Sequence, residues 1–426
     1  MQVENEYGSY GNDRQYMQAI RELMIECGMD ALLFTADGAE QKMLTGGLLP
    51  GTLATLNFGS APTERFALLE ECRPGEPRMC MEFWNGWFDQ WGGPHHTRSS
   101  KEVAEALEEM LALDASFNFY MFYGGTNFGF TAGANHYEEY QPTVTSYDDD
   151  ALLNEWGGYT EKYHTVRKIL RAHQGLQEEA LPPEPELQSI GRVELNEAAS
   201  LREHVDAIGQ MHRDLTPRSM ECYGQNYGMI LYRTRLTGAY GKDRLYLRGL
   251  ADKAYVFLDG KPIGSVYRND AEQSLALPEI GTGGAVLDIL VEAMGRVNYG
   301  RYMPDRKGLS QVSVEHQVLF DWEIYTIPMD DLRRVTYDGR ADEMPVLLHG
   351  EFSAQAGKSC FVHLPGFRKG MVFVNGFCLG RYWEIGPQRS LHLPGALLRD
   401  QNEIVVLELE GYQSRSVEIL NRHIIG

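Results

Sequence analysis

The chain has 426 residues, enough for two to four domains, and its 43% hydrophobic and 23% charged residues are typical of a globular protein. A formal net charge of −21, with no cluster of Lys and Arg to outweigh it, would repel phosphate backbones, so nucleic acid is not expected as a partner. No run approaches the roughly 18 apolar residues of a transmembrane helix, so no membrane partner is expected either.

The cysteines are sparse and lack both a CxxC pair and the His spacing of a zinc site. They predict reduced thiols and no metal or other cofactor, which favours a reducing compartment such as the cytoplasm. The first residues lack the pattern of a signal peptide. The missing signal peptide does not fix the compartment, which stays unknown, because the strand–helix alternation described below predicts that the chain is N-terminally truncated. The six cysteines of the chain are Cys27, Cys72, Cys80, Cys222, Cys360 and Cys378.

Short apolar segments alternate with amphipathic segments through the first 174 residues. Residues 1–6 have the pattern of a strand end, and further strands are predicted at 31–35, 52–57, 78–81 and 116–123. The intervening helices are predicted at 13–27, 61–72, 99–114 and 159–174, with a capping box from Ser99 to Glu102. This alternation predicts parallel strands covered by helices, as in a (β/α)8 barrel.

A closed barrel of this type needs eight strand–helix units and about 250 residues. The alternation ends near residue 174, so residues 1–175 are predicted to be the C-terminal part of a TIM-barrel domain that lacks its first three strands and most of the fourth. In such a barrel, catalytic residues follow the carboxyl ends of the strands.

The rest of the chain has a different pattern. Residues 176–218, which include a Pro/Glu-rich segment, are predicted to be a linker, and short alternating strands follow from residue 219. Two turns, Asp259-Gly260 and Asn375-Gly376, occupy the same V-F-x-[DN]-G-x-x-x-G pattern. This self-similarity predicts two related β-sandwich domains, at 219–330 and 331–426.

Two carboxylates have the placement that glycoside hydrolysis needs. Glu82 follows a predicted strand among aromatic residues, and Glu6 lies at the first strand end. Retaining hydrolysis uses one carboxylic acid to protonate the leaving oxygen and one carboxylate to attack the anomeric carbon. Glu4 competes with Glu6, because strand alternation points both side chains the same way. The alternative for Glu82 is an ion-paired residue in an aromatic core.

Six motifs of the chain form one ordered set, at 2–10, 82–92, 118–129, 145–148, 290–300 and 379–388. They resemble the retaining β-galactosidases of glycoside hydrolase family 35. In that family the residue that matches Glu6 is the acid/base, and the one that matches Glu82 is the nucleophile. The resemblance also implies that the all-β domains are jelly rolls, the second of them galactose-binding-like, and that Trp84 replaces a common Tyr. The implied galactose-binding residues are Asn5, Trp84, Trp87, Tyr120 and Tyr147.

The sequence therefore predicts a retaining exo-β-galactosidase that removes terminal non-reducing β-D-galactosyl residues from a galactoside or oligosaccharide by double displacement. Two alternatives stay open. The chain is a catalytically incompetent fragment that binds carbohydrate or acts as a scaffold, or it is an exo-glycosidase for another β-sugar such as glucosamine. Linkage preference and the activity of this chain by itself are not predicted, and a homo-oligomer is compatible with the sequence.

Overall fold

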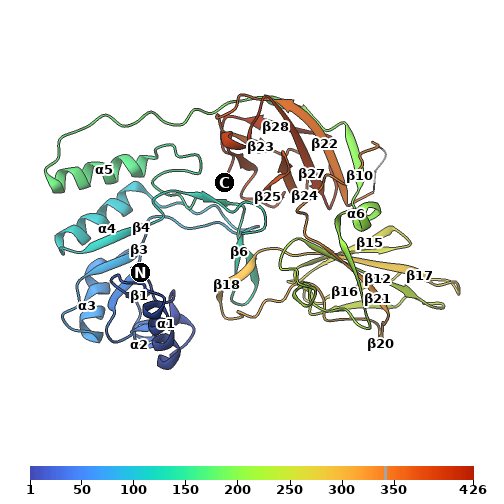
Figure 1. Ribbon diagram of the computed structural model, residues 1–426, viewed down its shortest axis with the longest axis horizontal. Coiled ribbons are helices and arrows are strands. Elements are labelled where there is room, and N and C mark those ends of the chain that lie inside the picture. Colours follow the sequence, from blue (N-terminus) through green and yellow to red (C-terminus); the bar gives the residue numbers. More distant parts are fainter. Residues whose placement is uncertain (340–342) are drawn as a thin grey trace. The chain divides into compact units, whose positions relative to one another are not determined.

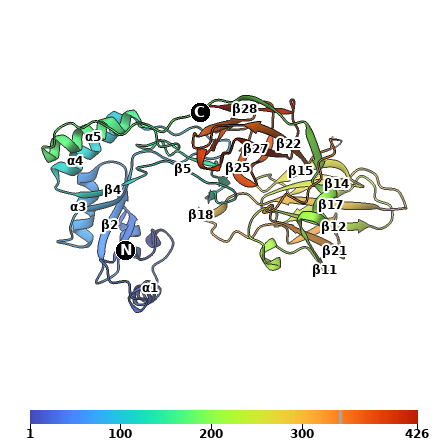
Figure 2. The ribbon, with the colours of Figure 1, turned by 45° about the horizontal axis from the view of Figure 1, so that its top comes forward.

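The computed structural model describes residues 1–339 and 343–426, which form two compact units. Most helices belong to the first unit and most strands to the second (Figures 1 and 2). Over the described ranges, none of the helices combines the length and the apolar character needed to cross a bilayer. The first unit comprises Met1–Phe88, His96–Gly125 and Tyr147–Pro185, and the second comprises Asp89–His95, Thr126–Ser146 and Glu186–Gly426.

The first unit is an α/β structure. Its elements are η1 (Tyr7–Ser9), α1 (Arg14–Glu26), β1 (Phe34–Gly38), α2 (Gln41–Gly47), β2 (Leu53–Phe58), α3 (Pro62–Cys72), β3 (Met79–Trp84), α4 (Ser100–Ala112), β4 (Ser116–Tyr120) and α5 (Glu161–Gln174). The four strands form a parallel sheet in the order β1-β2-β3-β4. A helix connects each strand to the next, because parallel neighbours need a crossover.

Local signals set the helix limits in this unit. The Asp13 side chain accepts hydrogen bonds from the backbone of Gln15 and Tyr16 at the start of α1. Ser99 and Glu102 form the predicted capping box of α4. Each cap stabilises its helix by about 1 kcal/mol. The helices cover one buried core, whose fully buried members include Leu44, Leu56, Phe83, Leu107 and Leu152.

The strand predictions around the two candidate acids differ from the structure. Residues 1–6 form an isolated bridge between Gln2 and Phe34 rather than a strand end, because Glu4 and Glu6 have φ values of 58° and 51°, outside the extended region. Strand alternation therefore does not apply to these two residues, and the prediction that their side chains point the same way is wrong. Glu82 also lies inside β3 rather than after it, since the strand continues to Trp84.

The second unit is almost entirely β. Its helical elements are η2 (Arg202–His204), α6 (Val205–Ile208), η3 (Met220–Tyr223) and η4 (Gly395–Leu397). Its strands are β6 (Gly133–His136), β7 (Tyr140–Pro142), β9 (Gly191–Glu194), β10 (Glu197–Ser200), β11 (Gln210–Asp214), β12 (Met229–Leu236), β13 (Arg244–Arg248), β14 (Lys253–Leu258), β15 (Lys261–Tyr267), β16 (Ser274–Ala276), β17 (Ala285–Glu292), β18 (Arg296–Gly300), β19 (Gln311–Val314), β20 (Gln317–Val318), β21 (Trp322–Ile327), β22 (Val346–Ser353), β23 (Cys360–His363), β24 (Lys369–Val374), β25 (Phe377–Trp383), β26 (Ser390–Leu393), β27 (Gln401–Glu408) and β28 (Ser416–Leu420). Two short strands, β5 (Gly125–Thr126) and β8 (Ser146–Tyr147), lie at the limits of the units.

These strands form two pairs of sheets and one further, small sheet. The six-stranded sheet β11-β21-β12-β17-β14-β15 and the four-stranded sheet β16-β13-β19-β20 contribute to one buried core. The five-stranded sheet β10-β22-β27-β24-β25 and the four-stranded sheet β26-β23-β28-β9 contribute to another. The small sheet is β18-β6-β7, in which β18 runs parallel to β6.

The repeated sequence pattern corresponds to a repeated hairpin. The turn residues Asp259 and Gly260 join β14 to β15 with φ values of 45° and 82°, and Asn375 and Gly376 join β24 to β25 with 52° and 79°. Positive φ at both positions is the type I′ geometry that Asx-Gly sequences favour. Both hairpins also have a register shift before the turn, so the two all-β parts contain the same kind of hairpin.

Residues 191–214, inside the predicted linker, contain regular structure. β9 and β10 pair with β28 and β22, and β11 pairs with β21. The Pro/Glu-rich signal applies to the segment before β9, which forms no regular strand or helix. The predicted domain limits stay predictions.

Candidate active site

The carboxyl ends of β2 and β3 bring the two predicted acids to one end of the sheet. Asn57 in β2 pairs in register with Glu82 in β3. The Nδ2 atom of Asn57 donates a 3.1 Å hydrogen bond to Oε1 of Glu6. Because neighbouring strands lie about 4.8 Å apart, the residue bonded to Glu6 lies next to Glu82 in the sheet, although the two carboxylates are distant in the sequence.

The position of Glu6 is fixed by a tight turn. Its backbone N–H donates to the carbonyl of Ala36 at 3.0 Å, and its own carbonyl accepts from Ser9 at 2.9 Å. In the next turn, the N–H of Gly8 donates to Oδ1 of Asp37 at 2.9 Å. A Cβ atom at Gly8 would lie only 1.7 Å from the Met43 carbonyl oxygen, so this approach requires glycine.

Glu82 lies against aromatic rings, as the sequence predicts. The Trp84 indole Nε1 donates a 3.0 Å hydrogen bond to Oε2 of Glu82. Trp84 packs edge to face with Trp87 at 5.4 Å, and Trp87 stacks on Phe88 at 5.1 Å. Phe88 in turn stacks on Tyr147 at 5.8 Å. The Trp87 ring is 40% exposed, so part of this wall is open to a ligand.

Two tyrosine hydroxyls meet at the same end of the sheet. The hydroxyls of Tyr120, the last residue of β4, and Tyr147 are 3.0 Å apart. Burial raises the pKa of both phenols, and the charge on Glu82 raises each of them further. Both groups are therefore neutral at neutral pH and can donate and accept hydrogen bonds.

A buried lysine fixes the loop that carries Tyr147. The Lys162 ammonium donates to the Asn85 carbonyl at 2.7 Å and to the Asp150 carboxylate at 2.5 Å. Beside this loop, burial raises the pKa of Asp149 to about 8. The Oδ2 atom of Asp149 has no hydrogen-bond partner within the described ranges.

The two acids affect each other's ionisation. Burial raises the pKa of Glu6, and the hydrogen bond from Asn57 partly opposes this effect. Burial also raises the pKa of Glu82. The hydrogen bond from Trp84 opposes this rise, and the charge of Glu6 adds to it. Asp37 has a pKa of about 6, again mainly because it is buried. Coupled carboxyls of this kind can hold one proton between them, which suits one acid and one base.

Asn5 and Glu4 have other contacts. The Asn5 side-chain oxygen accepts a 2.7 Å hydrogen bond from Gln2, and the residue is exposed. The Glu4 carboxylate accepts a hydrogen bond from the Tyr16 hydroxyl of α1. The structure therefore brings Glu6, rather than Glu4, to Asn57.

Asn57, Asp37 and Asp149 are site residues for which the sequence predicted no role. Asn57 is 1% exposed, and its Oδ1 atom has no partner among the residues that the structure describes. A polar residue that ends an apolar segment, as Asn57 and Asp37 do, is the signal that could have indicated them. Asp149 gives only a weak signal in a run of three aspartates.

Residues suited to holding a metal are not gathered anywhere in the described parts of the chain, where no group of three or more His, Cys, Asp or Glu has that arrangement. The site therefore consists of carboxylates, an amide, phenols and indoles, which are groups that bind and protonate polyhydroxylated ligands.

The chain matches three sequence models in order. Glycosyl hydrolases family 35 matches residues 1–173, the first all-β domain of β-galactosidase matches 217–328, and the galactose-binding domain of β-galactosidase matches 345–403. These matches define the class as a glycoside hydrolase with a catalytic domain followed by all-β domains.

Curated relatives identify the family. β-Galactosidase of Xanthomonas manihotis is 42% identical over 92% of this chain and 66% of that protein. The enzymes of Canis lupus familiaris and Homo sapiens are each 38% identical, over 100% and 96% of this chain and 69% and 65% of their own lengths. The chain belongs to glycosyl hydrolase family 35, and it spans about two thirds of the length of these relatives.

Solved structures add nothing to this assignment. Bacteroides uniformis β-glucuronidase 2 aligns with 96% of this chain and 50% of its own, at 9% identity and a TM-score of 0.26. That score is too low to indicate a shared fold.

Proposed function

We propose that this chain is a retaining exo-β-galactosidase in which Glu82 is the nucleophile and Glu6 is the acid/base. The observation that carries the proposal is Asn57, which is bonded to Glu6 and in register with Glu82. Membership of family 35, and relatives that are named β-galactosidases, support the galactoside as substrate.

In the first step, an oxygen of Glu82 attacks the anomeric carbon while the bond to the leaving oxygen breaks. Glu6 gives its proton to that oxygen, and a galactosyl ester of Glu82 forms. In the second step, Glu6 takes a proton from water, the water oxygen attacks the anomeric carbon, and Glu82 departs as a carboxylate. Burial raises the pKa of both acids, so that one proton can be held between them, and the Trp84 N–H opposes this rise at Glu82.

The sugar would be held by the surrounding side chains. The exposed Trp87 ring suits stacking on the apolar face of galactose, and the paired hydroxyls of Tyr120 and Tyr147 suit its hydroxyl groups. We include Trp84 as the residue that orients Glu82, and Asn5 as a binding residue that must first release Gln2.

The four parallel strands and their helices are, in this proposal, units of a TIM-type barrel, and the all-β domains are jelly rolls, the second of them galactose-binding-like. Residues 1–175, 219–330 and 331–426 are the proposed domains. The alternating order of β1 to β4 and the paired sheets of the second unit support this interpretation.

The test is hydrolysis of 4-nitrophenyl β-D-galactoside by the 426-residue chain. In E82G, azide should restore turnover and give α-galactosyl azide, because azide attacks the face that the nucleophile normally occupies. In E6G, azide should instead give the β-azide, because azide replaces water in the second step.

The matched control is E4Q, which alters a neighbouring carboxyl that faces Tyr16. We expect E6Q to lose about 10²- to 10⁴-fold in the first step with substrates whose leaving group needs protonation, and E4Q to lose far less. An E82G protein as active as the wild type, or equal losses in E4Q and E6Q, would contradict the assignment. A panel of aryl β-glycosides separates a galactosidase from an enzyme for another sugar.

A further inference from the structure

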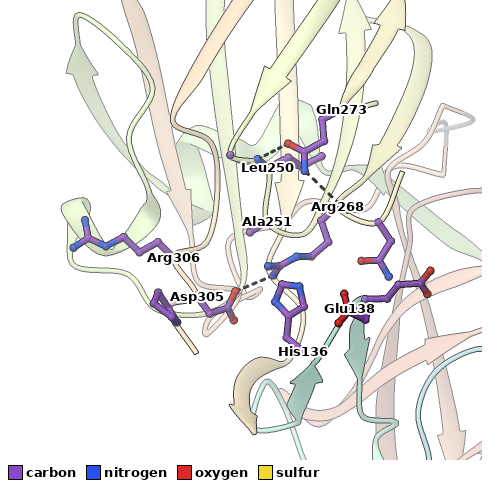
Figure 3. Close-up of a pocket in the computed structure, with 12 residues that line it drawn as sticks. His136, Glu138, Leu250, Ala251, Arg268, Gln273, Asp305 and Arg306 are labelled. Carbon is purple, nitrogen blue, oxygen red and sulfur yellow. Dashed lines mark hydrogen bonds and ion pairs between the residues drawn. The ribbon is translucent and has the colours of Figure 1, made fainter. Parts of the chain in front are cut away.

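A polar pocket of about 410 Å³ lies in the second unit, formed by segments from three parts of the chain. Residues after β6 contribute its acidic side, the segment from Gly249 to Gln273 contributes its floor, and residues 304–306 close it (Figure 3). Its volume is within the range of small-molecule sites, which is about 300–1,000 Å³.

The floor of the pocket is rigid. The Arg268 guanidinium is held by Asp252 at 2.7 Å and by Asp305 at 2.8 Å, and it lies 4.2 Å from the centre of the Tyr140 ring. The Gln273 side chain accepts from the Leu250 N–H at 3.2 Å. Figure 3 shows Arg268, Asp305 and His136 directed toward one another. These groups are therefore already oriented before a ligand arrives, which reduces the entropic cost of binding.

The hairpin that carries the acidic side is fixed to the same floor. The Asn269 side chain donates to the Tyr140 carbonyl at 2.8 Å and accepts from the Tyr140 N–H at 3.2 Å. These two bonds hold the β6–β7 hairpin, and with it His136, Glu138 and Glu139, in place.

The His136 imidazole has a ring nitrogen that is free to form a hydrogen bond in the described part of the chain. Its Nδ1 atom is buried and has no partner within residues 1–339 and 343–426. Burial, followed by the charge of Arg268, lowers the pKa of His136, so the imidazole is neutral at neutral pH. A neutral ring can accept from or donate to a hydroxyl group.

The charges around the pocket are largely balanced. Arg268 and Lys307 pair with Asp252 and Asp305, and Glu138 pairs with Arg301. The remaining charged residues of the lining, Glu139 and Arg306, are opposite in sign. The pocket therefore carries little net charge, and its hydrogen-bond donors and acceptors suit the hydroxyl groups of a neutral ligand.

An exposed aromatic ring lies beside this pocket. The Tyr302 ring is 44% exposed and lies 5.1 Å from the His136 ring, centre to centre. The Tyr302 N–H donates to the His136 carbonyl at 3.1 Å, which fixes the ring next to the pocket. Polar groups that converge beside an accessible aromatic face match a pyranose ring, which has hydroxyls at its edge and C–H groups on its face.

We propose that this pocket is a second carbohydrate-binding site, for a neutral oligosaccharide. It lies within the second unit and does not depend on the roles assigned to Glu6 and Glu82. It would hold a saccharide chain to the protein independently of hydrolysis.

The experiment uses the full 426-residue chain carrying E82Q, so that the probe is not consumed, and β-1,4-galactotetraose as the probe in isothermal titration calorimetry. We expect Y302A to weaken a binding event by about tenfold, the effect of losing one aromatic contact of about 1.4 kcal/mol. E138Q should weaken the same event. The matched control is F320A, which removes an aromatic ring that is 50% exposed in the same unit.

In the otherwise wild-type chain, Y302A should hydrolyse 4-nitrophenyl β-D-galactoside at the rate of the unmodified protein, which separates this site from the catalytic one. No binding of the tetrasaccharide, or binding that Y302A and E138Q leave unchanged, would overturn the proposal. Tighter binding of inorganic phosphate than of the tetrasaccharide would overturn it as well. A chain that binds through Tyr302 but hydrolyses nothing would refute only the catalytic assignment.

Discussion

Removing the hydrogen bond between Trp84 and Glu82 tests whether Glu82 is the nucleophile. W84F keeps the apolar ring and its edge contact with Trp87 but removes the Nε1 donor, which is 3.0 Å from Oε2. A hydrogen bond to a charged group contributes about 1.5–3 kcal/mol, and we expect the lower end because Glu82 is only partly buried. Since 1.4 kcal/mol corresponds to about tenfold, kcat/KM on the acidic side of the pH profile should fall by about tenfold.

The direction of the pH shift follows from the same bond. The Trp84 N–H lowers the pKa of Glu82, so its removal raises that pKa and the acidic limb of kcat/KM moves to higher pH. The assay is the pH dependence of kcat/KM for 4-nitrophenyl β-D-galactoside, with W87F as control because Trp87 lies beside Trp84 and stacks on Phe88. An acidic limb that stays in place in W84F, or that moves equally in W87F, would refute the role given to this bond.

Two further predictions concern stability. Lys369 and Arg381 both pair with Glu292, and all three side chains are nearly inaccessible, so K369M should lower the free energy of unfolding in urea by about 3 kcal/mol. The control K358M removes a more exposed ion pair and should lower it by less than about 1 kcal/mol. Equal losses in the two variants would contradict this prediction. Asp37 has a folded-state pKa of about 6, above its ordinary 3.8, so its contribution to stability decreases as pH rises from about 4 to 6, by about 3 kcal/mol. D37N should remove that pH dependence. If the difference in free energy of unfolding between the wild type and D37N stays constant across this pH range, Asp37 does not make this contribution.

Much of the helical structure could be predicted from local signals. The helices at α1, α3, α4 and α5 begin and end within two residues of their predicted limits, because Asp13, Ser99 and the apolar periodicity act over only a few residues. The beginning of β1 was predicted three residues too early. Apolar residues alone do not show where pairing starts, and β1 pairs with β2 only from Phe34 onward.

The sequence placed several residues of the candidate site near one another, but it missed Asn57, Asp37 and Asp149 and could not give the contacts. Glu82, Trp84, Trp87, Tyr120 and Tyr147 lie at one end of the first unit's sheet or in the loops that follow it, as the strand-end rule indicates. The side-chain contact of Asn5 with Gln2 could not be predicted. It depends on a turn with left-handed residues rather than on a strand.

The sequence by itself determined the family motifs, the change from α/β to all-β structure and the two Asx-Gly hairpins, because each depends on residues close together in the chain. Only the tertiary structure decided that Asn57 bonds Glu6 in register with Glu82, that Glu292 pairs with Lys369 and Arg381, and that His136 and Arg268 share one pocket. Strand register and sheet packing set these contacts, and both are fixed by burial of the whole core rather than by any local pattern.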